Sequence, residues 1–219
     1  MRDETSPRIL ERVAGRQGEL VLRHHGEDFE VIGNGMFLMD TRDGASERLL
    51  VRVALRDLRP RARLLIGGLG VGFSLAEALR SELVERVTVV EIEPAVIEWN
   101  ETHLAARSGH ALADPRVEVV CADLVAWLER PGPPFDAICL DVDNGPEWTV
   151  TDANAVLYSD PGLALLRERL APGGALTIWS ATDVDGFAAR LRRVLGRAET
   201  FTVEVPRGEP DVVYAAWRP

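Results

Sequence analysis

The sequence predicts an α/β fold, in which a doubly wound, mainly parallel sheet carries helices on both faces and follows a small β-rich extension. From residue 63 onward, short apolar segments of strand length alternate with amphipathic helical segments, a pattern typical of a sheet covered on both sides. Before residue 59, short extended segments are separated only by turn residues. We therefore expect a small N-terminal β-hairpin region with a linking helix over residues 1–58, and a larger domain over residues 59–219.

The N-terminal part is predicted to be a small antiparallel β unit. Its extended segments cover residues 19–22, 28–32 and 36–39. The Gly-Asn-Gly sequence at 33–35 is a strong hairpin turn signal, because these residues adopt positive φ at low cost. A helix is predicted over residues 46–58, with Ser46 as its N-cap. We expect Glu47 and Arg48 to lie on the solvated face of this helix.

The larger part is predicted to alternate strands and helices. The strands cover residues 64–66, 87–92, 117–121, 135–140, 175–179, 200–205 and 212–217. The helices cover residues 71–80, 94–104, 124–129, 163–170 and 185–195. The last helix has Asp185 as its N-cap and ends at Gly196, in agreement with the usual preferences at helix ends. The last two strands follow one another directly, so we expect them to complete the sheet as an antiparallel hairpin.

Composition excludes several classes of function. The 219 residues have a formal net charge of −10, and all 25 basic residues are arginine. Without lysine, a Schiff base, a lysine general base and a phosphate-binding loop of the Walker type are impossible. The acidic balance argues against a nucleic-acid partner. No apolar run reaches the roughly 18 residues of a membrane-spanning helix, and the charged N-terminus lacks a signal peptide's apolar stretch. We expect a cytoplasmic protein with no membrane partner.

The cysteines and histidines do not have the spacing of a metal site. Cys121 and Cys139 each lie in an apolar segment, and the four histidines are scattered along the chain. We interpret the two cysteines as reduced thiols of the core and expect no metal.

A nucleoside site is indicated by three features that each follow a predicted strand. Four glycines fall within residues 67–72, between the first strand and the first helix, where a chain without side chains lets a ligand approach the backbone. Glu91 ends the second strand and is suited to bind two ribose hydroxyls. Asp123 follows the third strand and is suited to accept a hydrogen bond from the adenine amine. Glu91 or Asp123 taken singly could instead be a helix N-cap or a solvated strand end, but the ordered set favours an adenosine site.

The segment after the fourth strand supplies candidate catalytic groups. Residues 141–148 read Asp-Val-Asp-Asn-Gly-Pro-Glu-Trp, which places Asp141 and Asp143 at the carboxyl edge of the sheet. A carboxylate there can take a proton from a nucleophile or hold an ammonium group. NAD and S-adenosylmethionine both remain possible ligands of the adenosine site, although hydride transfer has no specific need for this cluster.

Residues 64–180 resemble the polyamine aminopropyltransferases, the spermidine synthase family within the class I S-adenosylmethionine-dependent methyltransferase fold. The resemblance rests on the order of six motifs along the chain, which are Leu-Leu-Ile-Gly-Gly-Leu-Gly-Val-Gly at 64–72, Val-Thr-Val-Val-Glu-Ile-Glu at 87–93, Asp-Pro-Arg-Val-Glu-Val-Val at 114–120, Phe-Asp-Ala-Ile-Cys-Leu-Asp at 135–141, Leu-Tyr-Ser at 157–159 and Leu-Ala-Pro-Gly-Gly at 170–174.

The resemblance implies a Rossmann-like sheet with strand order 3-2-1-4-5-7-6 and an S-adenosylmethionine-binding domain over residues 59–219. It also implies a homodimer, because that family commonly forms one. Glu91 would bind the ribose, Asp123 the adenine, and Asp141 the amine acceptor. The full set of residues implied for the nucleoside substrate, S-adenosylmethionine or its decarboxylated form, is Gly67, Gly68, Leu69, Gly70, Gly72, Glu91, Ile92, Asp123, Leu124 and Asp141.

Three departures from the family pattern bear on the substrate. Gly70 stands where the family has an Asp that holds the aminopropyl ammonium of decarboxylated S-adenosylmethionine. Loss of that charge removes a repulsion of about 1–4 kcal/mol on the carboxylate of ordinary S-adenosylmethionine. The second acid of the family's Asp-x-x-Asp-Pro motif is replaced by Asn144, and the Tyr-His pair before the first core helix is absent.

These departures lead to a prediction of methyl transfer from S-adenosylmethionine to a small-molecule nucleophile. Asp141 is the predicted base or acceptor-orienting acid, with Asp143 second. Aminopropyl transfer to a diamine is the alternative, and a nucleoside-binding protein without turnover is the third possibility. We expect Asn144, Trp148 and Tyr158 in the acceptor pocket. Trp99 either flanks the adenine or packs in the core.

Overall fold

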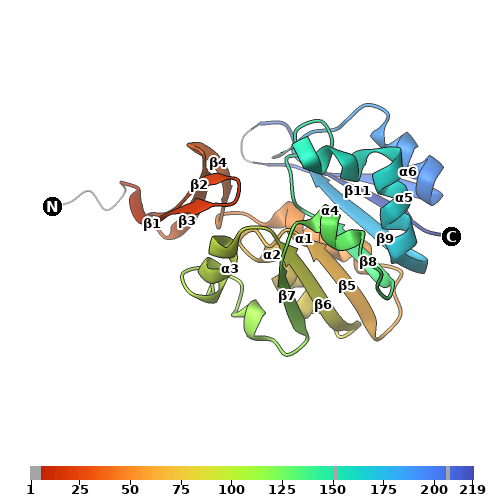
Figure 1. Cartoon of the computed structure of the whole chain (residues 1–219), viewed down its shortest axis with the longest axis horizontal. Helices are drawn as coiled ribbons and strands as arrows, with labels where there is room; N and C mark the ends of the chain where they lie inside the picture. The colour runs from red at the N-terminus through yellow and green to blue at the C-terminus, as the bar shows by residue number, and fades with distance from the viewer. Residues whose placement is uncertain (1–5, 150–151, 206–207) are drawn as a thin grey trace.

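The protein consists of two β-sheets joined through helix α1 (Figure 1). The computed structural model describes residues 6–149, 152–205 and 208–219. Residues 1–5, which include the charged N-terminus considered above, lie outside them. The N-terminal sheet is antiparallel, with its strands in chain order, namely β1 (Arg8–Gly15), β2 (Gly18–His25), β3 (Asp28–Gly33) and β4 (Met36–Asp40).

The larger sheet has seven strands in the order β10-β11-β9-β8-β5-β6-β7. Numbered from the first strand of this sheet and read from β7, this is the order 3-2-1-4-5-7-6, which confirms the predicted fold. Strands β5 to β9 are parallel, and β11 is antiparallel to both β9 and β10. The strands are β5 (Ala62–Gly67), β6 (Val84–Glu91), β7 (Val117–Cys121), β8 (Phe135–Leu140), β9 (Leu170–Ser180), β10 (Arg197–Val203) and β11 (Asp211–Trp217).

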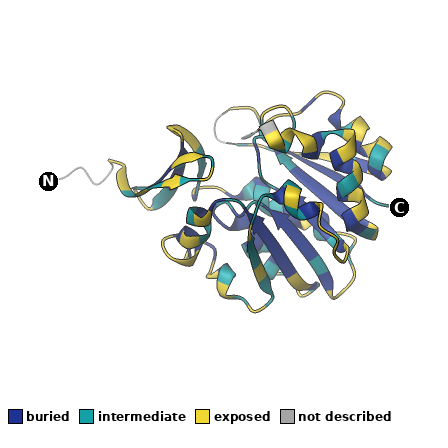
Figure 2. Ribbon diagram, viewed as in Figure 1, coloured by how far each residue is buried: buried dark blue, intermediate teal, exposed yellow. Residues whose placement is uncertain are grey.

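Helices cover both faces of the larger sheet, and its inner strands β5, β6, β8, β9 and β11 are mostly buried, as Figure 2 shows. One core packs α1, α2 and α3 on one face, and a second core packs α4, α5 and α6 on the other. The helices are α1 (Ala45–Leu55), α2 (Phe73–Leu79), α3 (Pro94–Glu101), α4 (Leu124–Leu128), α5 (Asp160–Arg169) and α6 (Phe187–Leu195), with short 3₁₀ helices η1 (Ala111–Ala113) and η2 (Asp152–Tyr158).

The turn between β3 and β4 has the predicted geometry. Asn34 and Gly35 have φ values of 51° and 80°, and two consecutive positive values are what a two-residue hairpin turn requires. Strand β1 was not predicted. It carries three charged residues among its first five and its pairing with β2 is interrupted between Ile9 and Glu11, so the alternation that identifies a strand is lost at this sheet edge.

Two predicted helix caps are wrong. Helix α1 has Gly44 rather than Ser46 as its N-cap, and α6 has Gly186 rather than Asp185. At α1, the Asp43 side chain accepts a hydrogen bond from the Ala45 N–H at 2.9 Å. This contact satisfies one of the helix's unpaired donors from a position one residue before the cap.

The N-terminal sheet is tied to the carboxyl edge of the larger sheet by two glutamates. Glu93, just after β6, is buried and accepts hydrogen bonds from the backbone N–H groups of Arg16 and Gln17 at 2.8 and 2.9 Å. Glu11 on β1 accepts from Trp99 Nε1 at 2.9 Å and lies 2.7 Å from His103 Nε2. The hydrogen bond from Trp99 and then that with His103 lower the pKa of Glu11. These contacts hold β1 and its turn against α3.

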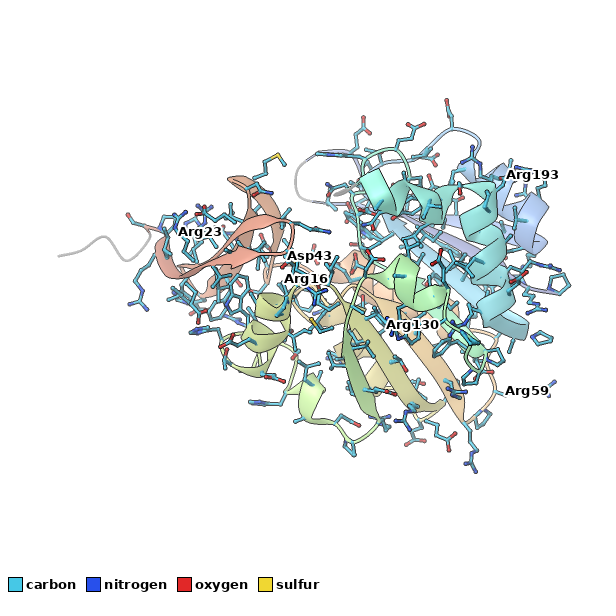
Figure 3. All side chains as sticks on the ribbon, viewed as in Figure 1. Arg16, Arg23, Asp43, Arg59, Arg130 and Arg193 are labelled. Atoms are coloured by element: carbon cyan, nitrogen blue, oxygen red, sulfur yellow. The ribbon has the colours of Figure 1, made fainter. Side chains whose placement is uncertain are left out.

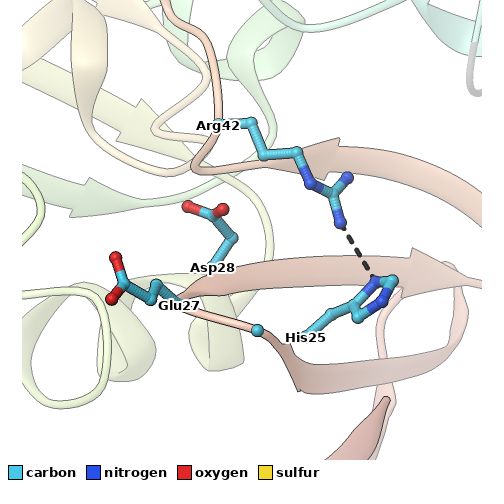
Figure 4. Close-up of a pocket in the computed structure, with 5 residues that line it drawn as sticks. His25, Glu27, Asp28 and Arg42 are labelled. Atoms are coloured by element: carbon cyan, nitrogen blue, oxygen red, sulfur yellow. Dashed lines mark hydrogen bonds between the residues drawn. The ribbon is translucent and has the colours of Figure 1, made fainter. Parts of the chain in front are cut away.

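A charged cluster stabilises the N-terminal sheet itself, and Figure 4 shows two of its members, Arg42 and His25, joined by a hydrogen bond. The buried Glu30 carboxylate contacts Arg23, Arg42 and His25. Burial alone would raise the pKa of Glu30, but the hydrogen bonds with Arg42, His25 and Arg23 outweigh burial and lower the pKa to about 2. The adjoining cavity of about 230 Å³ is lined only by residues of this sheet and the turn after it. Among the described residues, no helix is long and apolar enough to cross a membrane.

Candidate functional site

The glycine-rich loop between β5 and α2 approaches its neighbours too closely for side chains at two positions. A Cβ atom at Gly68 would lie 2.1 Å from the Asp141 carbonyl oxygen, and one at Gly72 would lie 2.8 Å from Asn100 Oδ1. Gly70 differs, because a Cβ there would meet only Met39 Sδ at 3.5 Å. All three glycines have positive φ. Gly68 and Gly72 are thus required by packing, whereas Gly70 leaves space beside the loop.

Glu91 lies against this loop at the end of β6. One carboxylate oxygen accepts from the Leu69 N–H and the other from the Glu93 N–H, both at 2.8 Å. Burial raises the pKa of Glu91, and the backbone N–H donors partly oppose that shift. Glu91, the residue predicted to bind the ribose, is therefore held rigidly beside the glycine-rich loop, and the half-buried Ile92 follows it.

Asp123 caps helix α4, which is the alternative considered for it from the sequence. Its side chain accepts from the Ala126 N–H at 2.8 Å, and the residue is half-buried. Leu124 follows it and is buried, and a Cβ at Gly67 would lie 2.6 Å from its Cδ2. Both predicted adenine-site residues thus follow β7 at the same sheet edge as Glu91. The adenine role of Asp123 remains a prediction.

Asp141 sits at the end of β8 within a group of acids that the topology brings together. Burial raises its pKa to about 8, and the charge of Glu47 is the next largest cause, followed by smaller contributions from Asp211 and Glu91. Ser74 Oγ, at the start of α2, lies 3.5 Å from Asp141 Oδ2. Asp141 therefore binds a proton near neutral pH, which suits a general base.

Glu47 and Asp211 were missed as site residues. Glu47 in the first turn of α1 is half-buried rather than solvated, and burial raises its pKa. Asp211 begins β11, and burial raises its pKa as well. Because β11 runs antiparallel to β9, its first residue lies where the parallel strands end. The antiparallel direction of β11, expected from the sequence, could have identified Asp211. The position of Glu47 directly after the N-terminal unit could have identified Glu47. Asp43, whose charge also raises the pKa of Glu47, lies toward the N-terminal sheet (Figure 3).

Asp143 and Tyr158 form a buried pair. Asp143 accepts hydrogen bonds from Tyr158 Oη at 2.8 Å and from Asn154 Nδ2 at 2.9 Å. Asp143 is 6% exposed and Tyr158 is 3% exposed. Burial, followed by the charge of Asp143, raises the pKa of Tyr158 far above its usual value. These contacts join the loop after β8 to η2. Asp143 thus has a visible anchoring role in this structure, and its predicted catalytic role remains a prediction.

The remaining residues predicted for the acceptor pocket, Asn144 and Trp148, lie on the loop that follows β8. The Asn144 N–H donates to the Trp148 carbonyl at 3.1 Å, and the Asn144 carbonyl accepts from the Ala181 N–H at 3.0 Å. Trp148 is 62% exposed. Trp99, by contrast, is fully buried on α3. Of the two predicted alternatives, flanking the adenine or packing in the core, the structure supports packing in the core. Within the described ranges, no group of three or more His, Cys, Asp or Glu residues could hold a metal ion.

A family model for the spermine/spermidine synthase domain matches residues 44–183. A polyamine aminopropyltransferase of Mycobacterium tuberculosis is 35% identical over 164 residues, which cover 73% of this chain and 30% of that protein. Polyamine aminopropyltransferase 2 of Pseudomonas aeruginosa is 34% identical over 170 residues, which cover 72% and 46% of the two chains. The chain therefore spans about a third to a half of the length of these relatives.

Solved structures agree on the fold. A crystal structure of spermidine synthase in complex with the transition state analogue AdoDATO has a TM-score of 0.82 at 19% identity and covers 97% of this chain and 74% of its own. Spermidine synthase from Thermotoga maritima has a TM-score of 0.78 at 18% identity, with 97% and 73% covered. The relatives' names support the aminopropyl alternative rather than the predicted methyl transfer. With a family model covering more than half of its length, this chain belongs to the spermine/spermidine synthase family.

Proposed function

We propose that the protein transfers an aminopropyl group from decarboxylated S-adenosylmethionine to a small amine. The observation that carries this proposal is the convergence of Asp141, Glu47 and Asp211 at the carboxyl edge of the sheet, where the pKa of each is raised chiefly by burial. Buried like charges destabilise one another until a cation compensates them. An ammonium group supplies that compensation, and both the proposed donor and a polyamine acceptor carry one.

The nucleoside half of the donor fits the neighbouring residues. Glu91 offers carboxylate oxygens beside the glycine-rich loop, and Gly70 leaves space beside that loop in which a ligand can lie. Residues of the loops after β6 and β7 then surround the adenosine. The order of these groups along one sheet edge supports a position for the sulfonium between Glu91 and Asp141.

The reaction requires little covalent participation by the protein. The amine nitrogen attacks the aminopropyl carbon bonded to sulfur, the carbon–sulfur bond breaks, and methylthioadenosine leaves with the electron pair. Because the attacking nitrogen must be neutral, the acceptor ammonium gives up a proton before the attack, and Asp141 is the base that we assign to this step. The protein's main contribution is alignment of the two substrates for in-line displacement.

One observation favours a second candidate, methyl transfer from S-adenosylmethionine itself. Gly70 carries no acid, and the space beside it is bounded by the uncharged Met39. A substrate carboxylate meets less repulsion there than it would beside an Asp. The names of the curated relatives favour the first candidate, so methyl transfer is the competitor against which it is tested.

The test is a product analysis combined with calorimetric titration. The protein is incubated with decarboxylated S-adenosylmethionine and a panel of diamines and triamines, and in parallel with S-adenosylmethionine. The proposal expects methylthioadenosine and an aminopropylated amine in equal amounts. Formation of S-adenosylhomocysteine and a methylated amine would instead establish the second candidate. Tight binding of either donor without any product would point to a nucleoside-binding protein without turnover.

A further inference from the structure

A second cavity, of about 650 Å³, lies among α1, α2 and the segment that leads from α3 through η1. It shares no lining residue with the acidic site, since Glu47, Asp141, Asp211, Glu91 and Asp123 are all absent from its wall. Glu47 and Arg48 are adjacent on α1 but point to different sides, as neighbouring residues of a helix do. Arg48 lines this cavity, whereas Glu47 acts on Asp141.

The wall of this cavity is basic, although the protein has a net charge of −10. Its charged residues are Arg48, Arg80, Arg107, Arg116, Glu77 and Asp114, a balance of four positive against two negative charges. Arg80 pairs with Glu77 at 3.2 Å, and Arg116 pairs with Asp114 at 2.9 Å. The two positive charges of the wall that these pairs leave over are those of Arg48 and Arg107.

Arg48 and Arg107 are held in place by aromatic rings rather than by acids. The Arg48 guanidinium lies 4.4 Å from the centre of the Phe73 ring, and that of Arg107 lies 5.8 Å from the Phe29 ring. Among the described residues, neither is in an ion pair or donates a side-chain hydrogen bond. Stacking on a ring leaves the N–H groups at the edge of a guanidinium free to bind an anion in a bidentate manner.

We propose that this cavity binds a small phosphate-bearing anion, such as pyrophosphate or a nucleoside polyphosphate. Its volume falls within the range of small-molecule sites. Each stacked guanidinium can donate two parallel N–H bonds to a pair of phosphate oxygens, and two guanidinium groups together match the multiple negative charge of such an anion. The exposed His110 adds a third donor on the same wall.

The cavity also touches the loop that would hold the donor. Ser108 lies in its wall, and a Cβ at Gly72 would lie 2.9 Å from the Ser108 Cβ. Asn100 Nδ2, from α3, donates to the Gly70 carbonyl at 2.8 Å. An anion that reorders the segment around Ser108 therefore acts on the glycine-rich loop. This regulatory part rests on the proposed function, whereas anion binding itself does not.

The test measures binding of pyrophosphate and of ATP to the full chain by calorimetry and by thermal unfolding, without donor or amine. The double variant Arg48→Gln/Arg107→Gln removes the two stacked cations. The double variant Arg59→Gln/Arg130→Gln removes two exposed arginines outside the cavity and serves as the matched control (Figure 3). We expect at least tenfold weaker binding in the first variant and unchanged binding in the second.

Two results would overturn the assignment. One is absence of saturable binding or of a rise in melting temperature up to 10 mM ligand, a conservative limit because millimolar binding is already weak. The other is equal loss of affinity in both double variants, which would indicate a general charge effect. Tighter binding of a single-stranded oligonucleotide than of pyrophosphate or ATP would show that the cavity binds a polymeric anion instead of a small one. If Arg48→Gln/Arg107→Gln without ligand unfolds at a lower temperature than the wild type, the test uses the single variant Arg107→Gln, because Arg107 is exposed.

Regulation is tested separately by repeating the donor titration with saturating pyrophosphate. A change in donor affinity that disappears in Arg48→Gln/Arg107→Gln supports coupling through Ser108. Pyrophosphate binding with no effect on donor affinity refutes coupling but leaves the anion site intact. Failure of the proposed aminopropyl transfer leaves the binding experiment unaffected.

Discussion

Asp141 and Glu47 act on each other across the carboxyl edge of the seven-stranded sheet. Asp141 ends β8 and Glu47 lies in the first turn of α1, 94 positions earlier in the chain. Burial raises the pKa of Asp141 to about 8, and the charge of Glu47 is the largest electrostatic contribution to that shift. A half-buried acid whose pKa lies close to neutral pH can exchange a proton with a bound amine, and in its ionised form it can bind a cation, which are the properties that the proposed transfer requires.

Replacing Asp141 by Asn should reduce turnover far more than donor binding. The amide retains the shape of the carboxylate but cannot take a proton, so we expect kcat to fall by about 10²- to 10⁴-fold. Donor affinity, measured by calorimetry, should change by only a few fold. The matched control is Asp136→Asn, which removes an acid that accepts from the Arg63 N–H at the opposite end of the same strand. Equal loss of turnover in both variants would contradict the assigned role.

The same variant should change how stability depends on pH. In wild type, the unfolded state releases the Asp141 proton near pH 4, whereas the folded state retains it to about pH 8. The folded state therefore binds more protons in this window, and stability falls as pH rises through it. Asp141→Asn should match wild type near pH 4 and exceed its melting temperature progressively up to pH 8. A constant difference across this range would show that Asp141 has an ordinary pKa.

Substitution of Gly70 by Asp should increase preference for decarboxylated S-adenosylmethionine. The position has room for a side chain, and its φ of 54° is tolerated by Asp at a cost of about 1 kcal/mol. A new charge beside the donor's tail should shift the ratio of the two dissociation constants by roughly tenfold or more. Gly70→Asn, which has the same shape without charge, is the control. If the two variants behave alike, the effect is steric.

Removal of the Tyr158 hydroxyl should weaken the fold around the acceptor loop. Tyr158→Phe takes one hydrogen bond from a buried carboxylate, so we expect a loss of about 1–3 kcal/mol in the free energy of unfolding, measured with urea.

If Asp143 mainly anchors the loop, Asp143→Asn should raise the KM for the amine more than it lowers kcat. A fall in kcat as large as that of Asp141→Asn would restore the catalytic role predicted for Asp143.

The Glu30 cluster should make the N-terminal sheet sensitive to acid. The pKa of Glu30 is lowered from 4.5 to about 2, so its contribution is complete above pH 4.5 and is lost as pH falls toward 2. Glu30→Gln should cost about 2 kcal/mol at pH 7, allowing for screening of the partly exposed arginines, and should flatten the acid limb of the stability curve. Glu27→Gln, an exposed neighbour in Figure 4, should leave both unchanged.

Local patterns explain which elements could be predicted from the sequence. The strands β7 and β8 match their predicted ranges, because each is a short, mainly apolar segment followed within two residues by an aspartate. Strand β1 escaped prediction since its charged residues hide the alternation, and the caps of α1 and α6 escaped because glycines take the place of the nearby Ser46 and Asp185. Glu91, Asp123 and Asp141 were found because parallel strands end at one edge, so chain order alone brings them together.

The sequence by itself determined the alternation of strands and helices, the glycine-rich loop and three of the acids at the sheet edge, since these follow from strand periodicity and from the rule that parallel strands share one carboxyl end. The order of the strands was implied by the family resemblance. Only the tertiary structure decided the rest of the site. Glu47 and Asp211 reach Asp141 through the packing of α1 and the reversal of β11, and Asp143 turns inward to Tyr158. Burial and distance set the charge state of a carboxylate, and neither is visible in the order of residues along the chain.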